Sequence, residues 1–205
     1  KGPKFILGHF GSLSHSRSLT PFIQALAHLS QKSPDVYRDL ELHIYGGQLD
    51  EAAEKAAHQL GVMDHVIRWG RIEHDPKTGM SGRDQVLLRM RDCDALALVH
   101  GNDAMCLEYI PSKLYEYLWM RRPIVATVHD NPQMARILRE QGHSVMECNL
   151  HMVSLEIHIS QLAEIIRQLW LKWSEQGLPD SDFLTPYSTA SSTRQMLAWA
   201  ESTYR

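Results

Sequence analysis

The sequence predicts an α/β fold, a doubly wound Rossmann-like parallel sheet with helices on both faces. Short apolar segments alternate along the chain with segments whose apolar residues recur at helical spacing. The apolar segments, most clearly residues 95–99, are runs rather than alternating patterns, which is typical of strands buried on both faces. Strands that alternate with helices form a parallel sheet with right-handed connections, so we expect a ligand site at the carboxyl ends of the strands.

Length and composition favour one globular domain. The 205 residues can bury a sizeable core, and the net charge of −3 argues against a nucleic-acid partner. The three cysteines have no Cys-x-x-Cys spacing, which indicates reduced thiols of a cytoplasmic protein. No apolar stretch approaches the roughly 20 residues of a membrane span. The chain begins Lys1-Gly2-Pro3-Lys4 without an initiator Met, so we expect a boundary cut from a longer protein.

The first half of the chain predicts three strands separated by helices. Residues 4–9, 40–45 and 66–69 are the apolar runs. The first helix follows with Ser18 as its expected N-cap, because Ser at that position can accept a backbone hydrogen bond. Asp50 is the expected N-cap of an Ala-rich helix that stops at Gly61.

The second half predicts three more strands, at residues 95–99, 123–128 and 144–147. A polar loop at 71–83 and a short helix at 85–91 precede the first of these strands. Asn131 and Pro132 start the helix before the last strand. A long helix at 154–175, whose apolar stripe includes Leu155, and a last helix at 188–202 complete the chain.

Residues 106–118, between the fourth and fifth strands, contain the candidate site. Glu108 is expected in a loop and Glu116 about two turns into a helix, with seven residues between them. Pro111 suits the first helical turn, and the free amides of that turn with Lys113 form a seat for an anion. Because Glu156 has the same spacing to Glu164 within the long helix, context and not spacing selects this pair. Two carboxylates around an anion seat suit a nucleotide sugar.

Four segments resemble the C-terminal, donor-binding half of GT-B glycosyltransferases of the large retaining family 4. The segments are residues 10–26, 42–47, 66–72 and 108–127, of which the last contains the specific run Pro-Ser-Lys-Leu-Tyr-Glu-Tyr-Leu. The resemblance spans essentially the whole chain. It implies a nucleotide-sugar-binding domain at 1–205, with the helix at 188–202 packing on an N-terminal, acceptor-binding half that this chain lacks.

The resemblance also implies a role for each candidate residue. Glu108 would contact the donor sugar and Arg17 would neutralise the leaving diphosphate, so these two residues are the catalytic candidates. Glu116 would accept hydrogen bonds from the ribose hydroxyls, as an ionised carboxylate can. The residues implied to bind the nucleotide sugar are Gly11, Ser12, Arg17, Arg71, Ile72, Ile110, Ser112, Lys113 and Glu116. Within this set the amides at 110, 112 and 113 would receive the diphosphate, and residues 71–72 would meet the base.

Three departures from the family pattern concern the phosphate site. Many relatives have an Arg directly after the first-loop glycine, where this chain has Ser12, and glycines after the first glutamate, where it has Tyr109-Ile110-Pro111. The turn before the fifth strand usually has a glycine, and here Arg121-Arg122 stands there. Lys113 could restore part of the missing positive charge.

The implied activity is retaining transfer of a sugar from a nucleotide diphosphate sugar to an acceptor, as in polysaccharide biosynthesis. No cofactor and no metal ion are expected, and the nucleotide sugar is the expected partner. The isolated chain should bind nucleotide but turn over poorly, because the acceptor half is missing. The expected location is the cytoplasm, with peripheral attachment to the inner membrane face through the missing half left open. Two alternatives remain open, a sugar-nucleotide epimerase of the same fold and a non-catalytic nucleotide-binding module.

Overall fold

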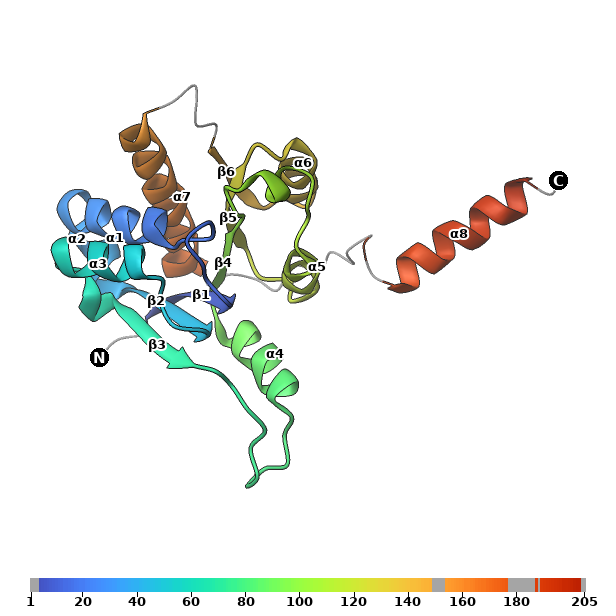
Figure 1. Cartoon of the computed structure of the whole chain (residues 1–205), viewed down its shortest axis with the longest axis horizontal. Coiled ribbons are helices and arrows are strands. Elements are labelled where there is room, and N and C mark those ends of the chain that lie inside the picture. Colours follow the sequence, from blue (N-terminus) through green and yellow to red (C-terminus); the bar gives the residue numbers. More distant parts are fainter. Residues whose placement is uncertain (1–3, 149–153, 177–186, 188, 204–205) are drawn as a thin grey trace.

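A computed structural model describes residues 4–148, 154–176, 187 and 189–203. Its centre is a parallel sheet in the order β3-β2-β1-β4-β5-β6 (Figure 1). The strands are β1 (Phe5–Gly11), β2 (Leu40–Gly46), β3 (Val66–Gly70), β4 (Ala95–Val99), β5 (Ile124–His129) and β6 (Ser144–Cys148). The predicted doubly wound α/β fold is therefore confirmed, and the winding reverses between β1 and β4, where a ligand crevice is expected.

Helices cover both faces of the sheet (Figure 1). They are α1 (Thr20–Lys32), α2 (Pro34–Asp39), α3 (Glu51–Gln59), α4 (Gly82–Asp92), α5 (Ser112–Trp119), α6 (Pro132–Glu140), α7 (Leu155–Gln176) and α8 (Thr189–Thr203), with 3₁₀ turns η1 (Met63–His65) and η2 (Ala104–Leu107). Helices α1, α2, α3 and α7 pack on one face, and α4, α5 and α6 pack on the other. In Figure 1, α8 lies apart from the sheet.

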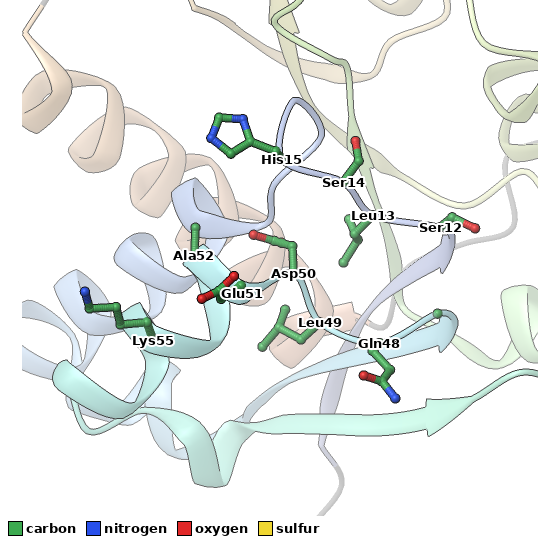
Figure 2. A pocket seen from close by; sticks show the side chains of 11 residues that line it. Ser12, Leu13, Ser14, His15, Gln48, Leu49, Asp50, Glu51, Ala52 and Lys55 are labelled. Carbon is green, nitrogen blue, oxygen red and sulfur yellow. The ribbon is translucent and has the colours of Figure 1, made fainter.

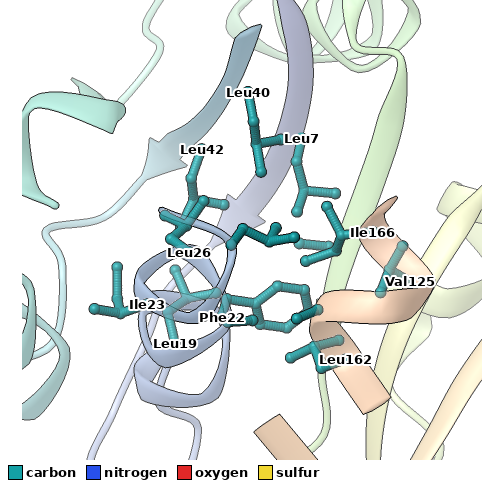
Figure 3. Packing of buried hydrophobic residues seen from close by; sticks show 14 of the residues in the cluster. Leu7, Leu19, Phe22, Ile23, Leu26, Leu40, Leu42, Val125, Leu162 and Ile166 are labelled. Atoms are coloured by element: carbon teal, nitrogen blue, oxygen red, sulfur yellow. The ribbon is translucent and has the colours of Figure 1, made fainter. Parts of the chain in front are cut away.

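The first face holds the larger apolar layer (Figure 3). Leu7 and Leu42 from the strands meet Phe22 from α1 and Leu162 and Ile166 from α7, all of them buried. Burial of a side chain of this size stabilises the fold by roughly 1.5–3 kcal/mol before the entropy of ordering is subtracted. Because β1 sends alternate residues to opposite faces, Phe10 joins the second layer, where it stacks on Tyr45 with ring centroids 4.5 Å apart.

Several local expectations need correction. Ser18 is not the N-cap of α1, which begins at Thr20. The Ser18 hydroxyl instead accepts a hydrogen bond from the Thr20 amide and donates one to Asp50. Pro111 precedes the first turn of α5 and occupies its N-cap position. Leu155 is 60 % exposed and lies outside the apolar stripe of α7. The short helix α2 was not expected, because six residues are too few to show helical periodicity.

Candidate functional site

Two loops meet beyond the carboxyl ends of β1 and β4. The Asn102 amide donates to the Ser16 carbonyl at 2.9 Å, which ties the β4–α5 loop to the β1–α1 loop. A β-carbon built on Gly101 would lie 3.1 Å from Cγ of Arg17, so the two loops lie close together at this point. Ser14 and Arg17 exchange backbone hydrogen bonds of 3.0 and 3.2 Å, which closes a tight turn. Arg17 is therefore held against the β4–α5 loop by its own backbone.

These loops enclose a small cavity of about 130 Å³. The residues that line it are His9, Ser12, Leu13, Arg17, Leu98, Val99, His100, Gly101, Cys106, Tyr109, Pro111, Ser112 and Lys113. Of the predicted site residues, the cavity brings together Ser12, Arg17, Ser112 and Lys113. Ser112 and Lys113 are also the first two residues of α5, where backbone amides lack intrahelical acceptors.

Lys113 crosses the cavity to the end of β1. A β-carbon on Gly11 would fall on its Nζ and Cε atoms, so Gly11 leaves the space that the lysine fills. Gly11 also has φ of +115°, a conformation that side chains with a β-carbon rarely adopt. Burial, with the nearby charge of Arg17, lowers the pKa of Lys113 to about 8, while Glu116 opposes this shift. The lysine is thus a desolvated cation that an anion would stabilise.

His9 is the unexpected member of the cavity wall. It comes from β1, is 2 % exposed, and its Nδ1 lies 3.1 Å from the Ala97 carbonyl of β4. Burial and the charges of Lys113 and Arg17 lower its pKa to about 3, so the imidazole is neutral. The sequence offered no sign that His9 lines a cavity, because this residue lies within an apolar strand and contacts Ala97, which is 88 positions away along the chain.

Two further residues fix the loop that carries the predicted anion seat. The Tyr109 carbonyl accepts hydrogen bonds from Nε2 of His100 at 3.2 Å and from Nδ2 of Asn131 at 3.3 Å. Asn131 also donates to the Cys106 carbonyl at 3.3 Å. His100 accepts the His129 amide at Nδ1, so both of its ring nitrogens are engaged. These side chains position the loop, a role that only contacts distant in sequence could reveal.

Tyr117 joins α5 to the end of β1. Its buried hydroxyl accepts the Phe10 amide at 2.9 Å, across 107 positions of sequence. Burial raises its pKa far above the ordinary tyrosine value, so it stays a neutral hydroxyl. This bond ties the second turn of α5 to the carboxyl end of β1, the strand that ends at Gly11.

The two predicted carboxylates lie outside the cavity wall. Glu116 pairs with Arg83 at 3.1 Å, and both side chains are substantially exposed. Glu108 follows η2 and is exposed. Glu116 nevertheless lies one helical turn from Lys113 and contributes to its electrostatic environment. Their assignments to ribose and sugar stay predictions.

The remaining predicted residues are also outside the cavity. Arg71 is highly exposed and lies 3.9 Å from Glu73, whereas Ile72 packs against the second apolar layer. Ile110 is partly buried against the same layer and follows the Tyr109 carbonyl that His100 holds. The assignments of these residues to base and phosphate stay predictions.

A larger and more open hollow lies on the other side of the β1–α1 loop (Figure 2). It encloses about 690 Å³ between residues 12–15 and residues 47–55. Asp50 is already engaged there, since it accepts hydrogen bonds from the Leu19 and Ala53 amides at 3.0 Å each. Lys55 and the other charged or polar residues at the rim are largely exposed. The hollow therefore has volume but no desolvated charge to hold an anion.

The chain contains Asp-x-Asp sequences at residues 92–94 and 180–182, a pattern that could suggest a metal site, and the second lies outside the described residues. The first lies at the amino end of β4, the edge of the sheet opposite to the cavity, and its Asp94 accepts a hydrogen bond from the Ile6 amide at 2.8 Å. Within residues 4–148, 154–176, 187 and 189–203, no group of three or more His, Cys, Asp or Glu is placed to hold a metal ion. None of the helices in this part of the chain is long and apolar enough to cross a bilayer.

Comparisons by sequence found nothing. No family model matches the chain, and no curated protein matches it.

Solved structures, in contrast, share the fold. WaaG, a glycosyltransferase involved in lipopolysaccharide biosynthesis, is 19 % identical with a TM-score of 0.56 over 94 % of this chain and 47 % of its own. The pneumococcal O-GlcNAc transferase GtfA, in complex with UDP and GlcNAc, is 16 % identical with a TM-score of 0.61 over 98 % of this chain and 36 % of its own. Anabaena HepE, in complex with UDP and glucose, is 20 % identical with a TM-score of 0.56 over 97 % of this chain and 48 % of its own. The chain thus has the fold found in GT-B glycosyltransferases and spans between about a third and a half of their length.

Proposed function

We propose that this chain, whose fold is shared with GT-B glycosyltransferases, binds a nucleotide diphosphate sugar as the donor-binding part of a retaining glycosyltransferase. The observation that carries the proposal is the cavity at the winding reversal between β1 and β4, where Arg17 lies near the partly buried Lys113 and the backbone amides of the first turn of α5. Such a position favours a phosphate in open α/β sheets. The presence of UDP in the GtfA and HepE structures supports a nucleotide ligand.

The diphosphate takes the cavity. Amides at Ser112 and Lys113, the Lys113 ammonium and the Arg17 guanidinium supply donors from two sides. As the bond between sugar and phosphate breaks, negative charge grows on the leaving diphosphate, and donors placed in advance stabilise it. By analogy with an oxyanion hole, the loss of one such donor would raise the barrier by roughly 3 kcal/mol. Arg17 is therefore a catalytic residue of the proposed transfer.

The nucleoside and the sugar lie on either side of that seat. Glu116, one turn further along α5, accepts the ribose hydroxyls once it leaves its exposed pair with Arg83. Glu108, in the loop before α5, contacts the donor sugar. Arg71 and Ile72 extend from β3 toward the base, and Ile110 contributes its amide to the phosphate. No metal ion or other cofactor enters the proposal.

The proposed acceptor half belongs to a longer protein. The chain spans 36–48 % of the three structures described above, which leaves room for such a half. Helix α8, with Met196 and Leu197 exposed at 71 % and 58 %, would pack on it. We place the whole enzyme in the cytoplasm, at or near the inner membrane face, in polysaccharide biosynthesis.

Calorimetric titration with UDP, GDP and ADP tests nucleotide binding directly. We expect one of them to bind, and Glu116→Ala to weaken that binding by about tenfold, because a carboxylate holding two hydroxyls contributes charge-assisted hydrogen bonds. Glu156→Ala on α7 is the matched control, since this exposed glutamate has the same spacing to Glu164 and does not line the cavity between β1 and β4. An unchanged affinity in Glu116→Ala would remove the ribose assignment.

Transfer itself requires the full-length protein. Wild type and Glu108→Gln should be assayed with the nucleotide sugar that binds best and with acceptor extracts. We expect transfer with retained anomeric configuration by wild type and a loss of at least about a hundredfold in the variant. Isomerised sugar nucleotide without transfer would instead indicate an epimerase.

A non-catalytic nucleotide-binding module is the second candidate function. It is favoured by Ser12, which replaces an arginine in the proposed phosphate site, and by the engagement of Glu116 with Arg83. Nucleotide binding by the full-length protein without transfer or isomerisation would support it.

A further inference from the structure

The imidazole of His9 has a defined tautomer. Its Nδ1 lies 3.1 Å from the Ala97 carbonyl, and a carbonyl oxygen can only accept. Nδ1 therefore carries the hydrogen, and in the neutral ring Nε2 carries a lone pair. Because β1 and β4 pair directly through Leu7 and Ala95, the contact belongs to the rigid centre of the sheet.

No hydrogen-bond donor of the described residues reaches the lone pair on Nε2. Within the residues that the structure describes, Nε2 of His9 is buried and has no hydrogen-bond partner. A buried polar atom without a partner destabilises the fold, and buried polar groups are nearly always paired. Since His9 forms part of the cavity wall, a ligand in the cavity is the natural source of the missing partner.

The groups around His9 keep it neutral while the cavity is empty. Lys113 approaches from α5 and Arg17 from the β1–α1 loop, and both charges oppose an imidazolium. His100, on the β4 side, has both ring nitrogens engaged and lines the same cavity. Glu116 acts on Lys113 from one turn along α5. A phosphate between the two cations would reverse the balance, because its negative charge favours a proton at the nearby ring nitrogen.

We propose that His9 is a specificity-determining residue whose Nε2 shares one proton with a phosphate oxygen of the ligand seated between Arg17 and Lys113. The inference rests on the proposed function and deepens it, because it makes phosphate recognition proton-coupled. The proton comes from solvent, and no other bond forms or breaks. A phosphate can carry that proton or leave it on the ring, so either form satisfies Nε2. The nucleoside alone brings no such group to the cavity.

Calorimetry in two buffers that differ in ionisation enthalpy counts the proton. At about pH 7, above the pKa of His9 and below that of Lys113, we expect UDP and inorganic pyrophosphate each to bind with uptake of about one proton. Lys113 is already mostly protonated at that pH and adds little. Uridine should show no uptake.

Substitutions of His9 distinguish the role of Nδ1 from the role of Nε2. His9→Asn keeps a donor for the Ala97 carbonyl but removes the atom at Nε2, so we expect uptake near zero and UDP binding about tenfold weaker. His9→Gln places a carboxamide near the Nε2 position and should recover part of the affinity. Thermal unfolding confirms that each variant folds. His143→Asn is the matched control, because burial also lowers the pKa of this partly buried histidine, to about 4, and it lies at the amino end of β5, outside the cavity lining. Its removal should leave uptake unchanged.

The outcomes distinguish the two proposals. UDP binding with unchanged affinity and unchanged proton uptake in His9→Asn would overturn the role of His9 and leave nucleotide binding intact. Failure of wild type to bind UDP, GDP, ADP or pyrophosphate would overturn both.

Discussion

Two hollows flank the loop after β1, and they differ in kind. The cavity between β1 and β4 holds about 130 Å³ and is lined by a buried histidine, His9, and a partly buried lysine, Lys113. The hollow beside α3 holds about 690 Å³, and its charged rim residues, such as Glu51 and Lys55, face solvent. Ser12 and Leu13 belong to both, so a single turn separates them.

This difference indicates that a charge removed from water, and not the volume of a hollow, identifies the anion site. A charge removed from water interacts more strongly with a ligand than one at the surface, where the dielectric constant is high and salt screens it. Folding has already removed part of the hydration of the Lys113 ammonium, so a bound phosphate would replace the lost interactions with water by a direct ion pair. Lys55 has lost little hydration and would gain little from a phosphate.

Removal of the charge of the partly buried Lys113 should have the largest effect on UDP affinity. Lys113→Met keeps the length of the side chain and removes its charge, so we expect UDP affinity to fall by between about tenfold and a hundredfold while the fold survives. Lys55→Met makes the same change in the open hollow and should leave affinity unchanged. Calorimetry on both variants is the measurement. Equal losses in the two variants would erase the contrast between the hollows.

The pH dependence of binding should follow the same lysine. In the free chain the pKa of Lys113 is about 8, and a bound phosphate raises it, so the contribution of Lys113 to affinity is full below about pH 8 and weakens above by up to about tenfold per pH unit. This slope adds to the fall in affinity that proton uptake at His9 causes at about pH 7 and above. Without ligand the sign reverses: the folded chain binds this proton more weakly than the unfolded chain, so the unfolding free energy rises as pH increases from about 8 to 10.5. Lys113→Arg, which stays charged, should lose the additional slope above about pH 8 and keep only the pH dependence that comes from His9. A slope identical to that of wild type would assign the titration to another group.

Stability should depend on the bond that anchors α5 to the cavity. Tyr117→Phe leaves the buried Phe10 amide without its acceptor, so we expect the free energy of unfolding to fall by about 1–2 kcal/mol in urea titrations. Tyr115→Phe changes an exposed neighbour on the same helix and should stay within about 0.5 kcal/mol. If both variants unfold alike, the hydroxyl of Tyr117 does not anchor the helix.

The smallest effect concerns the exposed pair at the rim. Arg83→Ala removes the partner of Glu116, and because both groups are exposed we expect stability to change by less than about 0.5 kcal/mol. UDP affinity should rise by no more than about threefold, since Glu116 is then free for the ribose. A tenfold loss of affinity would show that Arg83 itself contacts the ligand.

Local chemistry made much of the fold predictable. Asp50 and Asn131 were expected as N-caps, and each accepts the backbone amide three residues later, at 3.0 and 2.9 Å. A cap depends on one side chain and one turn, so neighbouring residues suffice to predict it. The strand β4 was predictable because a strand buried on both faces is apolar throughout. Leu155 was placed wrongly because helical spacing identifies a stripe but not where the stripe stops meeting the sheet.

The candidate site divides along the same line. Arg17, Ser12, Ser112 and Lys113 could be named from a loop and the start of a helix, and the structure brings them to one cavity. The partial burial of Lys113 could not be predicted from the sequence. It depends on the space left by Gly11, which is about a hundred positions away along the chain. Glu108 and Glu116 were named on the same grounds, and their roles stay predictions.

The chemistry of adjacent residues was sufficient to predict the order of the strands and of the α-helices other than α2, the N-caps Asp50 and Asn131, and the loop that carries the anion seat. Only the tertiary structure decided that β1 lies beside β4, and therefore that His9 meets Ala97 and Tyr117 meets Phe10. The physical reason is that desolvation and pairing belong to neighbours in space. A histidine in an apolar strand carries no mark of the two cations that will surround it.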